Sequence, residues 1–399
     1  MARRLVSFGT EGTIFSRDSA PRTAQPPTPA TPARLPLLVI EGLRKSGQTE
    51  GAQALAWLEL QIAKGELVSL LGPAGAGKSV AIDLVAGFLE PDAGRILIKG
   101  EKQARLPAWK RDIGLVAAEP DLFPELTVLG NAAFPLEARG MARGEREDRA
   151  AAMLERWGLP PALGSARPGS LPLARRMRVA FARGTVHEPA LLLLDDPLRM
   201  LDGEERDALA ADLRRLQGEL GLTVLHATRD AGLALGLSDA VAVLDAGRMR
   251  QLGRPQALYD DPADPVVAAL TGPCNRLPGT VLSVDDEEGC HVRLDCGVEA
   301  LGTPVLGPQG APVPGGRCTL VIRPERVAVA PLSPEEMGED AVPARLIEMR
   351  FAGDHLRLRL AIGEGGELVA HRSPGLILPE PGAQASIAWD LAAARVHRD

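Results

Sequence analysis

The sequence predicts an α/β protein that carries a second, all-β module after it. Between about residues 37 and 270, short apolar runs of strand type alternate with segments of helical periodicity. This alternation is typical of a mainly parallel sheet with helices on both faces. After about residue 271 the helical patterns nearly vanish, and short alternating runs follow one another between Gly, Pro and acidic turns. We therefore expect the second module to be built from strands.

The first part contains five expected strands, each a short apolar run of the kind that is buried on both faces of a parallel sheet. They are Val68–Leu71, Ile113–Ala117, Leu191–Leu194, Val224–Ala227 and Val241–Leu244. Between them, the spacing of apolar residues predicts helices over Lys78–Gly87, Glu145–Trp157, Leu173–Gly184 and Glu204–Leu220.

The second part contains six expected strands, and the turns between them favour a small barrel of the oligonucleotide/oligosaccharide-binding type. They are Thr280–Val284, His291–Leu294, Thr319–Ile322, Ala344–Met349, Leu356–Ile362 and Ser386–Trp389. Residues 1–36 are rich in Pro, Arg, Ser, Thr and Ala, a composition typical of a flexible extension. The expected organisation is an extension over 1–36, an α/β domain over 37–270 and a barrel domain over 271–399.

Composition narrows the function classes. The net charge of −7 and the aromatic content of 3% provide neither the basic excess nor the stacking rings of a nucleic-acid-binding protein. We therefore expect no nucleic-acid partner. No apolar run approaches the roughly 18 residues of a membrane-spanning helix, and we expect a cytoplasmic protein. The four cysteines match no zinc spacing and are expected to be free thiols.

The strongest chemical signal is a glycine-rich loop that matches the pattern G-x-x-x-x-G-K-[ST]. It runs Gly72-Pro73-Ala74-Gly75-Ala76-Gly77-Lys78-Ser79, and Val80 follows it. The loop lies between an expected strand and an expected helix, where backbone N–H groups and the helix N-terminus can surround a phosphate. Lys78 would reach the terminal phosphates, and the Ser79 hydroxyl would ligate Mg²⁺. We expect a nucleotide there; a glycine-rich turn without a ligand is the alternative.

A second signal is the apolar run that ends in Asp195, Asp196 and Pro197. An apolar strand that ends in a carboxylate puts Asp195 at the carboxyl edge of the sheet, where it can hold the water shell of Mg²⁺ opposite Ser79. Asp196 beside it could polarise an attacking water. Alone, this turn is explained by capping of the next helix; together with the glycine-rich loop it indicates nucleotide chemistry.

These motifs belong to a wider resemblance to the ATP-binding cassette (ABC) transporter ATPases. Leu194–Asp202 resembles the acid-strand and D-loop segment of that family, and Arg178–Arg183 resembles the helix after its signature sequence. Four further segments resemble the Q-loop region that docks on the membrane subunits, the switch segment and the end of the ATPase domain: Ile113–Val116, Leu122–Val128, Val224–Asp230 and Leu258–Pro262.

The β module shares in this resemblance. Ile322–Val327, Phe351–His355 and Trp389 resemble the TOBE-like accessory domain of importer ATPases, most closely those of the spermidine/putrescine type. Polyamines are thus the nearest solute class, and other organic cations, ferric iron and sugars stay open.

The resemblance implies site residues, cofactors and partners. The cofactors would be ATP and Mg²⁺. The nucleotide would be bound by Gly72 to Val80, and the metal by Ser79 and Asp195. The catalytic residues would be Asp196 and Arg229. The partners would be permease subunits, a second ATPase subunit in a homo- or heterodimer and, indirectly, a solute-binding protein. The chain would then lie on the inner face of the plasma membrane, held by the permease.

Several positions depart from the family pattern. The signature Leu-Ser-Gly-Gly-Gln aligns with Leu171-Pro172-Leu173-Ala174-Arg175, which lacks the serine hydroxyl and the glycines. Smaller departures are Ala118 for the Q-loop glutamine, Asp196 for the catalytic glutamate, Arg229 for the switch histidine, Ser46 for the adenine-stacking aromatic and Val80 for a hydroxyl residue.

Three hypotheses follow from these matches and departures. The first is an importer ATPase subunit that couples ATP binding and hydrolysis to transport. The second is a degenerate ABC subunit that binds nucleotide with little or no hydrolysis and pairs with a competent ATPase. The third is a phosphate-loop protein outside transport, which the resemblance of the β module disfavours.

Overall fold

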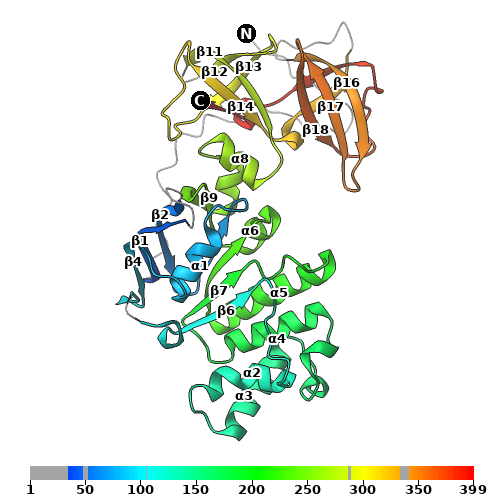
Figure 1. Ribbon diagram of the computed structural model, residues 1–399. Coiled ribbons are helices and arrows are strands. Elements are labelled where there is room, and N and C mark those ends of the chain that lie inside the picture. Colours follow the sequence, from blue (N-terminus) through cyan, green and yellow to red (C-terminus); the bar gives the residue numbers. More distant parts are fainter. Residues whose placement is uncertain (1–34, 48–52, 105, 286–288, 333–340) are drawn as a thin grey trace. The chain divides into compact units, whose positions relative to one another are not determined.

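The structure is a computed structural model that describes residues 35–47, 53–104, 106–285, 289–332 and 341–399 (Figure 1). By its contacts the described chain forms two compact units, one up to Leu258 and one over Tyr259–Asp399. By these contacts, residues 259–270 belong to the second unit, whereas the sequence places the change of domain after residue 270. The domain limits 37–270 and 271–399 stay predictions, and most of the extension predicted for 1–36 lies outside the described residues.

The first unit is built on a ten-stranded sheet with the spatial order β5-β4-β1-β2-β10-β9-β3-β8-β7-β6. Strands β9, β3, β8, β7 and β6 run parallel to their neighbours within this group, and β1, β2, β4 and β5 pair antiparallel. The bounds are β1 Pro36–Ser46, β2 Gln53–Ala63, β3 Leu67–Leu71, β4 Ala93–Ile98, β5 Glu101–Lys102, β6 Ile113–Ala117, β7 Leu191–Asp195, β8 Thr223–Thr228, β9 Ala240–Asp245 and β10 Arg248–Gly253.

All five strands predicted for this unit are confirmed, and each forms part of the parallel group. The sheet as a whole is mixed rather than mainly parallel. The antiparallel strands were not among the predicted strands. Strands β1 and β2 both contain apolar residues in a row, Leu37 to Ile40 in β1 and Ala54 to Leu58 in β2, but each exposes part of one face, unlike the fully buried runs of the parallel group.

Helices cover the two faces of the parallel strands. Alternate residues of β7 show the division: Leu191 and Leu193 pack in a core with helix α1 and the antiparallel strands, whereas Leu192 and Leu194 face a core with the remaining helices. The bounds are α1 Lys78–Ala86, α2 Val128–Glu137, α3 Arg143–Arg156, α4 Leu173–Thr185, α5 Gly203–Leu220 and α6 Ala231–Leu237. The predicted helices correspond to α1, α3, α4 and α5 and are confirmed.

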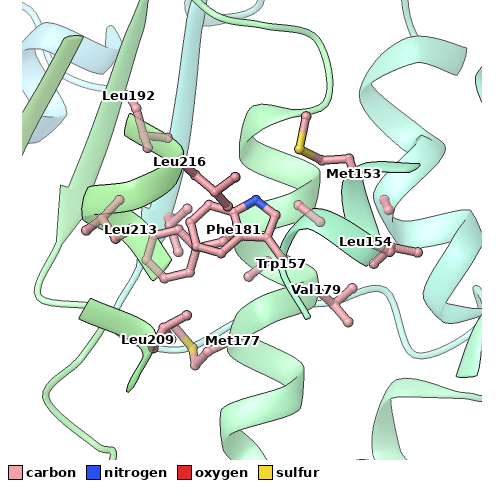
Figure 2. Packing of buried hydrophobic residues seen from close by; sticks show 14 of the residues in the cluster. Met153, Leu154, Trp157, Met177, Val179, Phe181, Leu192, Leu209, Leu213 and Leu216 are labelled. Carbon is pink, nitrogen blue, oxygen red and sulfur yellow. The ribbon is translucent and has the colours of Figure 1, made fainter. Parts of the chain in front are cut away.

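Trp157 and Phe181 lie at the centre of the second of these cores (Figure 2). Both side chains are fully buried, and their rings stack with centroids 4.7 Å apart. The indole Nε1 donates a hydrogen bond of 3.0 Å to the Thr185 hydroxyl, which in turn donates to the Phe181 carbonyl. The indole N–H, the one polar group of the buried tryptophan, therefore has a hydrogen-bond acceptor inside the core.

The second unit combines a closed five-stranded barrel, in the order β11-β12-β13-β20-β14, with a separate five-stranded sheet, β15-β19-β16-β17-β18. The bounds are β11 Asn275–Asp285, β12 Gly289–Leu294, β13 Glu299–Pro304, β14 Arg317–Ile322, β15 Ala328–Pro331, β16 Val342–Phe351, β17 Leu356–Ile362, β18 Gly366–Arg372, β19 Gln384–Ala388 and β20 Ala394–Arg398. All six predicted strands are confirmed. The sequence suggested one barrel, but the strands divide between a barrel and a sheet that share one apolar core.

Short helices complete the described chain. Helix α7 spans Pro255–Asp260, helix α8 spans Pro265–Thr271, and single 3₁₀ turns lie at Ala108–Lys110, Pro161–Leu163, Pro168–Ser170, Pro324–Arg326 and Leu391–Ala393. None of the helices in the described ranges is long and apolar enough to cross a membrane.

Arg323 attaches helix α8 to the barrel. Its guanidinium is buried and donates to the carbonyl oxygens of Ala268 at 2.7 Å and Tyr259 at 3.0 Å, and to the Thr271 hydroxyl at 2.8 Å. It also lies over the Tyr259 ring, 3.9 Å from the centroid. Because a buried guanidinium needs many acceptors, this one residue after β14 fixes the segment that precedes the barrel.

His226 makes the first unit sensitive to acid. The side chain lies in β8 within the apolar core; its Nδ1 is 2.9 Å from the Ser69 hydroxyl, and its Nε2 has no hydrogen-bond partner among the described residues. Burial lowers the pKa of His226 from 6.5 to about 4. As the pH falls below 6.5, the unfolded chain therefore takes up a proton that the folded chain refuses, and stability falls.

We predict that His226 costs the first unit about 2 kcal/mol of stability between pH 7 and pH 5. His226→Gln removes the titrating group while keeping a polar neighbour for Ser69, so the variant should lose less stability over this range. Urea unfolding followed by tryptophan fluorescence at both pH values measures the difference. An identical pH dependence in the two proteins would contradict the prediction.

Candidate functional site

The carboxyl ends of three neighbouring parallel strands build the site. Strand β8 lies between β3 and β7, and the register places Leu71 of β3 opposite Thr228 of β8, while Ala227 of β8 is opposite Asp195 of β7. The glycine-rich loop follows β3, Asp196 follows β7, and Arg229 of the switch segment follows β8. Strand ends that are adjacent in the sheet therefore bring together three segments that are far apart in the sequence.

Glycines give the loop after β3 its shape. Gly75 and Gly77 have φ angles of 78° and 93°, which residues with a Cβ rarely adopt. A Cβ on Gly77 would also lie 2.6 Å from the carbonyl oxygen of Ala54. Glycine at this position allows the loop to lie against the start of β2, and it allows helix α1 to begin at the next residue.

The first turn of α1 supplies N–H groups and a cation. The N–H groups of Lys78, Ser79 and Val80 have no acceptor within the helix, because they belong to its first turn. The Lys78 ammonium is buried and donates to the carbonyl oxygens of Gly72 at 2.7 Å and Pro73 at 2.8 Å. Burial lowers the pKa of Lys78, and Asp196 opposes this effect. Two of the three N–H groups of the ammonium are bonded to these carbonyl oxygens, and the third is left for another acceptor.

Ser79 and Asp195 form the oxygen pair that the sequence assigned to a metal. The Ser79 hydroxyl donates to Asp195 Oδ1 at 2.9 Å. Neither residue is fully buried, and both line the same pocket. The pair consists of a hydroxyl and a carboxylate, which are hard oxygen ligands of the type that Mg²⁺ prefers.

Asp196 sits in an unusual turn that is held from two sides. Its φ is 54°, its N–H donates to the Ala227 carbonyl at 2.8 Å, and its Oδ1 accepts from the Thr228 hydroxyl at 3.0 Å. Arg229 Nε lies 3.8 Å from Asp196 Oδ2. Burial raises the pKa of Asp196, while Thr228 and two arginines oppose that rise. The carboxylate is therefore fixed toward the loop in a partly desolvated environment.

These residues enclose a pocket of about 370 Å³. Of the predicted site residues, all those from Ala74 to Val80 line it, together with Asp195, Asp196 and Arg229. Gly72 and Pro73 lie outside the lining, and their carbonyls hold Lys78. The sequence missed two lining residues, Ala54 and Arg199. Ala54 carries no chemical signal, whereas Arg199 lay within the D-loop match and is a cation where phosphate is expected.

The departures from the family motifs differ in their distance from the pocket. Ala118, like Asp196 and Arg229, lines the pocket, so these changes alter its wall directly. Pro172 occupies the N-cap position of α4, which has no side-chain cap there, and it is exposed. The helix begins at Leu173, as predicted, so Pro172 is compatible with its start.

A phosphate loop between strand and helix, beside two carboxylates at neighbouring strand ends, defines the class of P-loop nucleotide-binding proteins. Family models agree with the geometry: the model described as ABC transporter matches residues 55–199, and that of the TOBE domain matches residues 320–396.

Curated relatives extend the match over most of the chain. The spermidine/putrescine import ATP-binding protein PotA of Frankia alni is 38% identical, over 85% of this chain and 73% of that protein. The PotA protein of Acidothermus cellulolyticus is 34% identical, over 91% of this chain and 94% of that protein. The chain belongs to the family of ATP-binding subunits of ABC transporters, and it carries a C-terminal TOBE domain.

Solved structures resemble the first unit. CbiO1 from Clostridium perfringens, part of the ABC transporter complex cbiONQ, aligns with a TM-score of 0.52 and 29% identity over 57% of this chain and 91% of its own. The dimeric bacterial ABC transporter cassette MJ0796 aligns with a TM-score of 0.50 and 27% identity over 55% of this chain and 98% of its own.

We predict that Gly77→Ala weakens ATP binding at least tenfold. The added methyl group would collide with the Ala54 carbonyl and move the loop away from the phosphates. Gly140→Ala is the matched control, because Gly140 also has a positive φ, of 77°, but has open space around it and lies outside the pocket. Calorimetric titration with ATP compares the two variants. Wild-type affinity in Gly77→Ala would contradict the prediction.

Proposed function

We propose that this chain binds Mg-ATP in the pocket at the ends of β3, β7 and β8 and hydrolyses it to drive import of a polyamine-like solute. The observation that carries the proposal is the convergence of Lys78, Ser79, Asp195 and Asp196 on one pocket. Similarity to import ATP-binding proteins over most of the chain favours this hypothesis over a degenerate subunit that only binds nucleotide.

The oxygen pair fits Mg²⁺. Ser79 and Asp195 are already in hydrogen-bond contact, and two such ligands suit a cation that takes its remaining ligands from phosphate and water. The described residues contain no group of three or more His, Cys, Asp or Glu side chains that would form a metal cage by itself. When bound, Mg²⁺ would neutralise phosphate charge; Ser79 and Asp195 would hold it.

The chain's own residues divide the remaining tasks. The first-turn N–H groups of α1 and the Lys78 ammonium bind the phosphates, with the loop from Gly72 shaping the cradle. Asp196 accepts the proton of an attacking water or orients it, and the burial that raises its pKa makes the carboxylate a better proton acceptor than an exposed one. Arg229 places a guanidinium next to Asp196, where negative charge develops on the transferred phosphoryl group.

The loop before α2 supports a permease contact. Phe123 and Phe134 lie with ring centroids 4.6 Å apart, and the Arg183 guanidinium lies 5.6 Å from the Phe123 ring. Asn131, fully buried, accepts from the Phe123 N–H and donates to its carbonyl. A partly exposed aromatic pair on a rigidly held loop suits a membrane subunit, through which the chain would be held at the inner face of the membrane.

The remaining partners follow from the proposed role. A second ATPase subunit, identical or not, would pair with this chain, and a solute-binding protein would deliver the solute to the permease without touching this chain. The solute class follows from the PotA relatives, which are spermidine/putrescine import proteins.

We predict that the purified protein releases phosphate from ATP and that Lys78→Ala abolishes this activity, because the variant loses the cation that reaches the phosphates.

Asp196→Asn should lower kcat by about a hundredfold or more while changing KM little, since the amide cannot accept a proton. Asp148→Asn removes an exposed carboxylate of α3 and serves as control. Phosphate release that survives Lys78→Ala would refute the assignment.

We predict that Phe123→Ala lowers both co-purification with the permease and spermidine uptake by cells that carry the transporter, while ATP affinity is retained. The aromatic ring provides the contact area, and it lies outside the pocket lining. Phe351→Ala, which removes an exposed ring from the second unit, is the control. If Phe123→Ala cells take up spermidine at the wild-type rate, this docking surface is wrong; if wild-type cells take up none, the solute class is wrong.

A further inference from the structure

Arg199 is a pocket residue that the motifs did not single out. It follows β7 by four residues, and its N–H donates to the Asp196 carbonyl at 3.2 Å, which closes a turn directly after the acidic pair. This turn brings the Arg199 side chain into the pocket lining together with Asp195 and Asp196. The turn thus presents a guanidinium on the same wall as the two carboxylates.

The Arg199 guanidinium is available to a ligand. It forms no hydrogen bond or salt bridge within the parts of the chain that the structure describes, and the residue is exposed. Most other arginines of this unit behave differently: Arg178, Arg206 and Arg214, for example, each pair with a carboxylate. An arginine that lines a pocket and has no protein partner is a ready donor for an anion.

The charge of the pocket supports the same conclusion. Lys78, Arg199 and Arg229 supply three cations, and Asp195 and Asp196 supply two carboxylates. Without the two arginines, the lining would carry an excess of negative charge and would repel a polyphosphate. The two arginines make the net charge of the lining side chains positive. The affinity of this pocket for a highly charged anion therefore depends on them.

The three cations differ in what holds them. Lys78 donates to the loop carbonyls of Gly72 and Pro73. The Nε of Arg229 lies 3.8 Å from Asp196 Oδ2, whereas the Arg199 side chain has no hydrogen bond or salt bridge in the described parts of the chain. Lys78 is therefore fixed to the phosphate loop and Arg229 to the carboxylate after β7, and Arg199 is the cation that stays available to a ligand.

We infer that Arg199, together with Arg229, binds the terminal phosphate of a nucleoside triphosphate and makes this site prefer a triphosphate to a diphosphate. A diphosphate held by the loop and Lys78 would leave both guanidinium groups beyond its reach. A triphosphate would extend to them and would draw Arg229 away from Asp196. This inference rests on the proposed nucleotide site and adds a selectivity to it.

The test compares the binding of two nucleotides to the full-length protein. Calorimetric titration, with Mg²⁺ present, measures the affinity for ADP and for the β,γ-imido analogue of ATP, which is not hydrolysed. Arg199→Ala should weaken binding of the triphosphate analogue about tenfold and that of ADP less than about twofold. Arg199→Lys, which keeps the charge without the forked donor, should lose less. Arg143→Ala, which removes an exposed arginine of α3, should change neither affinity.

The outcomes separate this inference from the proposed function. If the wild-type protein binds neither nucleotide, or if Lys78→Ala leaves both affinities unchanged, the nucleotide site itself is wrong and the inference falls with it. If the wild-type protein binds both nucleotides but Arg199→Ala weakens both equally or neither, only the inference is overturned. An unchanged unfolding midpoint of Arg199→Ala confirms that the variant is folded.

Discussion

The parallel register of three neighbouring strands is the constraint on which the site depends. Because β3, β8 and β7 run in one direction and end at the same level, their carboxyl ends deliver three segments to one edge of the sheet. None of these segments could form the pocket by itself: the loop provides the N–H groups and Lys78, the end of β7 and the next residue provide the acidic pair, and Thr228 at the end of β8 with Arg229 after it holds Asp196 in place.

Burial of charge gives this pocket its chemistry. Lys78 and Asp196 are both largely removed from water, which moves the pKa of the lysine down and that of the aspartate up; Asp196 opposes the shift of Lys78, and Thr228 and two arginines oppose the shift of Asp196. The positive φ of Asp196 and its bond to Thr228 fix the carboxylate although the backbone there is strained. A site with this arrangement is poised to exchange its internal ion pairs for contacts with a phosphate chain.

Three of the departures from the family pattern lie together in the structure. Ala118, Asp196 and Arg229 all line the pocket, and Arg199 lines it with them. These changes therefore alter the wall of the proposed nucleotide pocket, whereas Pro172 and Ser46 lie outside it. The loop from Gly72 to Ser79 matches the pattern completely, so the proposed phosphate cradle is retained while two guanidinium groups line the same pocket.

The phosphate loop, the acid strand, the five parallel strands and the all-β character of the second unit were predictable from the sequence, because each depends on a local pattern of glycine, charge or apolar period. The structure was needed to show that the sheet is mixed, that the second unit divides into a barrel and a sheet, and that Ala54 and Arg199 line the pocket. These features arise where strands and loops that are distant in the chain meet, and no local pattern encodes which partner a strand or a side chain will meet.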